Sequence, residues 1–300
     1  MELWVVFTIA AAATQALRTA VQRRMTTTIG NLGASYIRFS YAFPIAWLFL
    51  FLYSEYAGTA LPDLPAKFWI WINLAALTQV IFTILLVQLF SHRSFAAAVA
   101  FSKTEVLQTA IFEALILGVV VTLQTGIAIA LGVFATVLLS FAKANLALAN
   151  LRAAIFSRQV AIGLAAGAFL GFCTVCYGAA LHTMIGGDVI GNAMYAAAIG
   201  TTIQAICFGI YIFIVRREQF IASFVAWRQC SMAGIWAATT SICWFAGFAL
   251  YSVAPVRAVG QIELLFSVGF SVLYFNERIS RVEFTAIAML ATSIIMVLLD

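Results

Sequence analysis

Runs of about 20 mostly apolar residues dominate the sequence and restrict its fold more than any other feature, because this is the length of helix that crosses a bilayer. Polar or proline-containing segments separate them, as between Glu55 and Lys67, where Pro62 and Pro65 stand. Ten such runs are present: Leu3–Ala20, Gly33–Tyr53, Phe68–Phe90, Phe95–Val119, Thr122–Phe141, Val160–Leu181, Val189–Ile214, Met232–Val253, Val256–Phe275 and Val282–Leu299. We predict an all-α integral membrane protein with ten transmembrane helices. Nine or eleven remain open, since very short turns join the fourth run to the fifth and the eighth to the ninth.

The composition excludes a water-soluble protein. Hydrophobic residues make up 64% of the 300 residues, charged residues only 9%, and the mean hydropathy is +1.06. A soluble domain carries roughly 25% charged residues. In a membrane protein, the net charge of +5 is better explained by basic cytoplasmic loops than by nucleic-acid binding. The five cysteines lie in or beside apolar segments, so we expect them to pack rather than bind metal, and we expect no cofactor.

The distribution of Lys and Arg predicts the orientation of the chain, because cytoplasmic loops are enriched in these residues. Loops after even-numbered runs contain Lys67 alone. Loops after odd-numbered runs contain Arg23, Arg24, Arg93, Lys143, Arg152, Arg158, Arg216, Arg217, Arg228, Arg278 and Arg281. We therefore expect both termini on the non-cytoplasmic side of a cell membrane of the bacterial inner-membrane type, crossed many times.

A weak internal repeat relates the two halves of the chain. A shift of 158 residues places Glu105 on Glu263 and the segment 128–130 on the segment 286–288, both of which read Ala-Ile-Ala. A matched glutamate is informative because Glu is rare inside membrane spans. We predict two repeats, residues 1–150 and 151–300, each with five helices. An odd number of spans gives the repeats opposite topology, as in many secondary transporters.

The second half also carries a family resemblance. The segment 261–266, Gln-Ile-Glu-Leu-Leu-Phe, and the segment 274–278, Tyr-Phe-Asn-Glu-Arg, followed by a last span, resemble the C-terminal pattern of EamA-type carriers of the drug/metabolite transporter superfamily. The segment 36–41 resembles the second span of that family. The first copy departs from the pattern, because Val119 stands opposite Glu277. The resemblance implies a ten-helix carrier of two inverted five-helix repeats around a central cavity. Related proteins move amino acids, nucleotide derivatives, sugars, cations and drugs.

Polar residues in the fourth run are candidates for substrate binding, since a charge at bilayer depth is costly and normally faces a cavity or a partner. Glu105 shares a helix face with Gln108, and this carboxylate and amide can bind a substrate ammonium group or exchange a proton. Lys103 lies on a different face. The alternative for Glu105 is a structural pair with Arg38 or Arg257. We expect Glu113 to approach the outer end of the span and be solvated.

The remaining candidates lie in other runs. In the ninth run, Glu263 and Gln261 are the repeat-related counterparts of Glu105 and Lys103. Arg257, at the start of the same run, is a candidate for function or, alternatively, an interfacial anchor. Arg38 suits a substrate carboxylate or a structural role. Trp244, Tyr177 and Tyr195 are aromatic candidates for a cavity wall. Gly163, Gly167 and Gly171 form a ridge on the sixth run that predicts close helix contact.

These features favour a secondary transporter, an exporter in our interpretation, for a small polar or zwitterionic metabolite such as an amino acid. Alternating access with proton coupling or exchange fits two matched glutamates. The alternative is a channel or a receptor-like subunit. We expect no enzymatic activity, because the two histidines, His92 and His182, stand at span ends without a catalytic cluster. The expected partners are the lipid bilayer and the substrate, without nucleic acid, for a monomer or homodimer.

Overall fold

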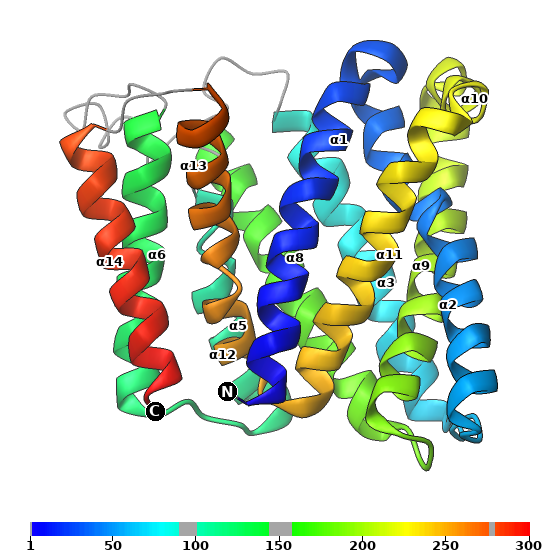
Figure 1. The fold of residues 1–300 in the computed structure, drawn as a ribbon, viewed down its shortest axis with the longest axis horizontal. Coiled ribbons are helices and arrows are strands. Elements are labelled where there is room, and N and C mark those ends of the chain that lie inside the picture. The colour runs from blue at the N-terminus through cyan, green and yellow to red at the C-terminus, as the bar shows by residue number, and fades with distance from the viewer. Residues whose placement is uncertain (1, 90–100, 144–157, 276–279) are drawn as a thin grey trace. The chain divides into compact units, whose positions relative to one another are not determined.

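The structure, a computed structural model, describes residues 2–89, 101–143, 158–275 and 280–300, and these are helical apart from short connections (Figure 1). The described residues contain no strand, and an isolated antiparallel bridge joins Asp63 to Ile185. The helices are α1 Leu3–Ser40, α2 Ala42–Ala57, α3 Ala66–Leu89, α5 Glu105–Leu117, α6 Leu123–Lys143, α8 Arg158–Thr183, α9 Val189–Val215, α10 Arg217–Val225, α11 Trp227–Leu250, α12 Val253–Val259, α13 Ile262–Phe275 and α14 Arg281–Leu298.

Seven described segments are long and apolar enough to cross a membrane, counting the stretch Leu3–Ala57, which holds both α1 and α2, as one. The protein is therefore an all-α membrane protein of the multi-pass kind, as predicted. The number of spans and their orientation remain predictions. The start of the expected fourth span, Phe95, lies outside the described residues, as do Arg93, Arg152 and the motif residues 276–278.

The helices gather into two compact units. Unit 1 contains Met1–Val80 and Cys176–Ser252, and unit 2 contains Ile81–Val175 and Val253–Asp300. Each unit draws on both halves of the sequence, and α3 and α8 contribute to both units. In unit 1, α1 packs on α11 and α9, and α2 packs on α9. In unit 2, α6 packs on α14, and α5 packs on α12.

The first helix is longer than the sequence predicts. Residues 21–29, expected as a loop, continue α1, and Arg23 and Arg24 are exposed on this extension. The helix is interrupted at Gly30, which has φ +74°. The side-chain Oε1 of Gln219 accepts hydrogen bonds from the backbone N–H groups of Leu32 and Gly33, at 3.1 Å each. Gln219, which belongs to a different helix, α10, thus supplies the acceptor that the N–H groups of a new helix start need.

A second interruption follows at Tyr41. Pro44 lacks an N–H and its ring crowds the carbonyl of the residue four positions earlier, Ser40, so the helix breaks there. The broken turn packs against α11, where a Cβ on Gly234 would lie 2.4 Å from the Cβ of Tyr41. The Tyr41 hydroxyl donates to the carbonyl of Ser223 at 2.9 Å. The break is thereby fixed to two neighbouring helices.

The start of α9 is fixed by a conventional cap. Asp188 Oδ1 accepts from the N–H groups of Ile190 and Gly191, both at 3.0 Å, and from the Tyr53 hydroxyl at 2.8 Å. Partial burial opposes ionisation, but these donors outweigh it and hold the pKa of Asp188 below its usual value. An ionised cap also interacts favourably with the positive end of the helix dipole.

In unit 2, α6 and α14 run antiparallel and lie side by side (Figure 1). Gln124, near the start of α6, donates to the carbonyl of Met296 at 2.9 Å, and Ser293 donates to the carbonyl of Ala128 at 2.6 Å. Gly132 leaves room for this serine, since a Cβ there would lie 2.5 Å from its Oγ.

We predict that Gly30→Ala destabilises the protein more than Gly58→Ala. Both glycines have positive φ, but Gly30 also has ψ 171°, a combination that essentially only glycine adopts, whereas Gly58 has the left-handed helical conformation, in which a side chain costs about 1–2 kcal/mol. A Cβ on Gly30 would also lie 2.5 Å from the side chain of Gln219, whereas nothing lies within 4 Å of a Cβ on Gly58. Thermal unfolding in detergent measures the difference. Equal melting temperatures for the two variants would show that the contact with Gln219 is unimportant.

Candidate functional site

Two interrupted helices meet in unit 2. Residues 101–102 are helical, Lys103 and Thr104 form a turn, and α5 begins at Glu105. The second interruption separates α12 from α13 at Gly260 and Gln261. The sequence analysis predicted one span over each of these regions and did not predict the interruptions. Interruptions of transmembrane helices commonly mark binding sites, because they place helix ends and polar groups at bilayer depth.

The start of α12 is held by a glutamate from α5. Glu113 Oε1 accepts from the N–H of Val253 at 2.6 Å, and its Oε2 accepts from the N–H of Ala254 at 2.8 Å. The next residue, Pro255, has no N–H to satisfy. Glu113 is 1% exposed. The expectation of a solvated Glu113 was therefore wrong, and this side chain fixes α12 on α5.

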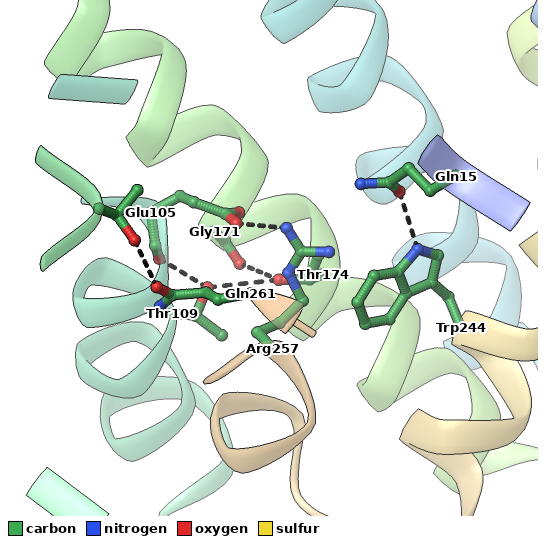
Figure 2. A network of polar contacts seen from close by, with 9 residues as sticks. Gln15, Glu105, Thr109, Gly171, Thr174, Trp244, Arg257 and Gln261 are labelled. Carbon is green, nitrogen blue, oxygen red and sulfur yellow. Dashed lines mark hydrogen bonds and ion pairs between the residues drawn. The ribbon is translucent and has the colours of Figure 1, made fainter. Parts of the chain in front are cut away.

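A buried ion pair joins the same two helices. The guanidinium Nη2 of Arg257, on α12, donates to Glu105 Oε1, at the first residue of α5 (Figure 2). Both side chains are largely buried, with 5% of the Glu105 side chain and 11% of the Arg257 side chain exposed. Of the two structural partners considered for Glu105, the structure selects Arg257. Removing one member of such a pair leaves an uncompensated charge and typically costs about 3–5 kcal/mol.

Three buried polar atoms of α5 and of the turn between α12 and α13 have no hydrogen-bond partner in the structure: Glu105 Oε2, Gln108 Oε1 and Gln261 Nε2. In both glutamines, the second polar atom of the side-chain amide is hydrogen-bonded. Gln108 Nε2 donates to Thr104 Oγ1 at 3.2 Å, and Gln261 Oε1 accepts from Thr136 at 2.7 Å. Buried polar groups are nearly always satisfied, so a cluster of unsatisfied ones indicates a place for a ligand or water.

Helix α8 packs closely behind the first interruption. A Cβ on Gly167 would lie 2.9 Å from the Ser102 carbonyl oxygen, and one on Gly171 would lie 3.1 Å from the Glu105 carbonyl oxygen. The predicted close contact along the glycine ridge is confirmed for these two residues. Thr109 and Thr174 approach across the same interface, with 3.5 Å between their hydroxyl oxygens (Figure 2). The interrupted segment therefore lies against the backbone of α8.

The other charged candidates occupy different places. Lys103 lies in the turn before α5 and is half-buried. Glu263, in the first turn of α13, is also half-buried. Arg38 belongs to unit 1, where its guanidinium carbon lies 4.5 Å from the centre of the Phe39 ring.

The aromatic candidates belong to unit 1 as well. Trp244 Nε1 donates to Gln15 Oε1 at 3.0 Å (Figure 2). The hydroxyl of Tyr177 accepts from Gln204 Nε2, and its ring lies 4.4 Å from that of Phe245, centre to centre. Tyr195 packs edge-on against Trp47. The substrate-binding role predicted for these residues stays a prediction, and the structure assigns each of them contacts between helices.

Glu113 is the site residue that sequence reasoning missed. Two signals pointed to it. Glu113 lies eight residues after Glu105, so the two side chains project from nearby parts of one helix face. Pro255 is the third residue of α12, and a proline in the first turn is typical of a helix start, whose first N–H groups need an acceptor. Neither signal identifies the partner, because α5 and α12 are about 140 residues apart in the sequence.

Comparison with known proteins identifies the fold and no more. No family model matches the chain, and no curated protein matches it. A solved crystal structure matches with a TM-score of 0.71, covering 98% of this chain and 98% of that one, at 13% sequence identity. The two chains are therefore similar in fold along nearly their whole length.

We predict that Glu113→Gln lowers the melting temperature in detergent. A glutamine offers one acceptor oxygen to two N–H donors and turns its own N–H group toward the second, which leaves a buried donor unsatisfied at a cost of about 1–3 kcal/mol. The matched control is Glu55→Gln, at an exposed glutamate of α2. Equal stability of the two variants would contradict a structural role for Glu113.

Proposed function

We propose that this protein is a secondary transporter of a small polar or zwitterionic metabolite, such as an amino acid, and that it works by alternating access in the cell membrane. We also propose that it is a carrier of the drug/metabolite transporter type and acts as an exporter. The proposal rests on features of unit 2 and on the sequence patterns described above.

The positions of the helices support an inverted repeat. Helices α6 and α14 begin at Leu123 and Arg281, which are 158 residues apart, the same offset that aligns the two halves of the sequence. The turns at Lys103 and Gln261 have the same offset. An antiparallel α6–α14 pair is the arrangement that two repeats of opposite topology produce at their contact.

The observation that carries the proposal is the buried Glu105–Arg257 pair between two interrupted helices, with unsatisfied polar atoms beside it. An inert helical bundle gains little from such a site, since burying charges is costly and well-packed apolar residues serve stability equally well. A carrier needs groups that change partners during its cycle. Glu105 and Arg257 have this property, because each can form its ionic contact with the other or with a substrate.

The matched glutamates also provide a route for coupling. Glu105 and Glu263 can each alternate between a proton and a polar partner, which allows proton-coupled transport or substrate-for-substrate exchange. Facilitated transport uses the same site without proton movement. A pH gradient imposed across the membrane distinguishes these modes, since only the rate of proton-coupled transport changes with it.

Counterflow in proteoliposomes tests the proposal. Vesicles containing the purified protein are preloaded with one metabolite pool at a time, beginning with amino acids and purines, and labelled substrate is added outside. We expect saturable stimulation by the internal pool and a loss of at least about tenfold in the initial rate for Glu105→Gln, since a charge-assisted contact is worth about 1.5–3 kcal/mol.

The matched variant is Glu263→Gln, at the repeat-related position. Unchanged transport in both variants would remove the carboxylates from the mechanism. A current across a planar bilayer that does not saturate, without counterflow for any pool, would contradict a carrier and favour a channel.

A further inference from the structure

We propose that the two helix interruptions of unit 2 bind a neutral α-amino acid, with its ammonium group on Glu105 Oε2 and Gln108 Oε1 and its carboxylate on Gln261 Nε2 and Arg257. This inference rests on the proposed transport function. It adds the substrate class and the orientation of the substrate in the site.

The unsatisfied atoms define the chemistry of the ligand. Two of them, Glu105 Oε2 and Gln108 Oε1, are acceptors three residues apart at the start of α5. The orientation of the Gln108 amide is fixed by its contact with the Leu164 carbonyl oxygen at 3.4 Å, which accepts only from an N–H group. This end of the site therefore suits a ligand group with at least two hydrogen-bond donors, and a charged ammonium group also matches the Glu105 carboxylate.

The other end of the site offers donors. Gln261 Nε2 carries N–H groups without an acceptor, in the turn between α12 and α13. Arg257 lies four residues earlier and turns its guanidinium toward Glu105 (Figure 2). An amide N–H and a guanidinium are suitable donors for a carboxylate.

This pattern excludes several classes of metabolite. A dicarboxylate without hydroxyl groups has no hydrogen-bond donor for Glu105 and Gln108, and a polyamine has no acceptor for Gln261. Net charge gives the same result. The Glu105–Arg257 pair is neutral, so a zwitterion leaves the buried site neutral, whereas an anion or a cation adds an uncompensated charge at high cost.

The ion pair then occupies the place of the substrate when the site is empty. An amino acid between the two side chains gives Glu105 an ammonium partner and Arg257 a carboxylate partner, so neither charge is left alone. The exchange requires Arg257 to move away from Glu105. Since Arg257 is carried by α12, substrate binding acts directly on the second interrupted helix.

Calorimetric titration of the purified full-length protein in detergent tests the inference. The probes are L-alanine, L-leucine and L-phenylalanine, each compared with its N-acetyl derivative, which has lost the ammonium group. We expect at least one free amino acid to bind and its N-acetyl derivative to bind at least about tenfold more weakly, because it lacks a charge-assisted donor.

Two site variants and two controls complete the experiment. Glu105→Gln and Gln108→Leu should each weaken binding of the same amino acid about tenfold or more. Gln124→Leu, at an exposed position of α6, and Glu283→Gln, at a half-buried position in the first turn of α14, should leave it unchanged. If Glu105→Gln does not fold, Gln108→Leu still tests the site, because it keeps the ion pair.

The outcomes separate this inference from the proposed function. No binding of any of the three amino acids, or equal binding of their N-acetyl derivatives, overturns the inference, and counterflow of another metabolite would then leave the transport function standing. Amino-acid binding with the predicted pattern supports the inference, and absence of counterflow for the same amino acid would then count against transport alone.

Discussion

The requirement that every buried backbone N–H and C=O be satisfied governs this structure, because neither the packed protein interior nor the bilayer core offers water to an unpaired peptide group. A continuous helix meets the requirement by itself, and an interrupted helix needs help from its neighbours. At Gly30 the help comes from Gln219, which accepts two N–H groups. At the start of α12 it comes from Glu113, which accepts two more. Both interruptions are thus stabilised by a side chain from another helix.

The candidate site follows from the same requirement. The interruptions at residues 103–104 and 260–261 bring Glu105 and Gln261 to helix starts, and Glu113 holds α12 so that Arg257 reaches Glu105. The glycines of α8 allow its backbone to approach the first interruption closely. What these contacts leave unsatisfied is a small set of side-chain atoms with a definite pattern of donors and acceptors. The proposed chemistry of the ligand comes from that pattern.

Much of the fold could be predicted from the sequence, because the length and spacing of apolar runs record membrane spans directly. The continuity of individual helices could not. Pro44 explains the interruption at Tyr41, but residues 21–29 look like a polar loop and are helical. The residues of the candidate site were predicted in part, and their function stays a prediction. Glu105 and Gln108 could be identified because charged and polar residues are rare inside membrane spans. The roles of Glu113 and Arg257 depend on contacts between residues about 140–150 positions apart in the sequence, and no local pattern contains such contacts.

A double-mutant cycle on Glu105 and Arg257, read as both melting temperature and counterflow rate, tests the central claim most directly. If the pair is a buried contact that substrate replaces, Glu105→Gln and Arg257→Met should each destabilise the protein, and the double variant should recover stability but not transport, because no unpaired charge remains while both substrate contacts are lost. Additive losses of stability would show that the two side chains do not interact. Recovery of transport in the double variant would show that the pair is structural and that the substrate binds elsewhere.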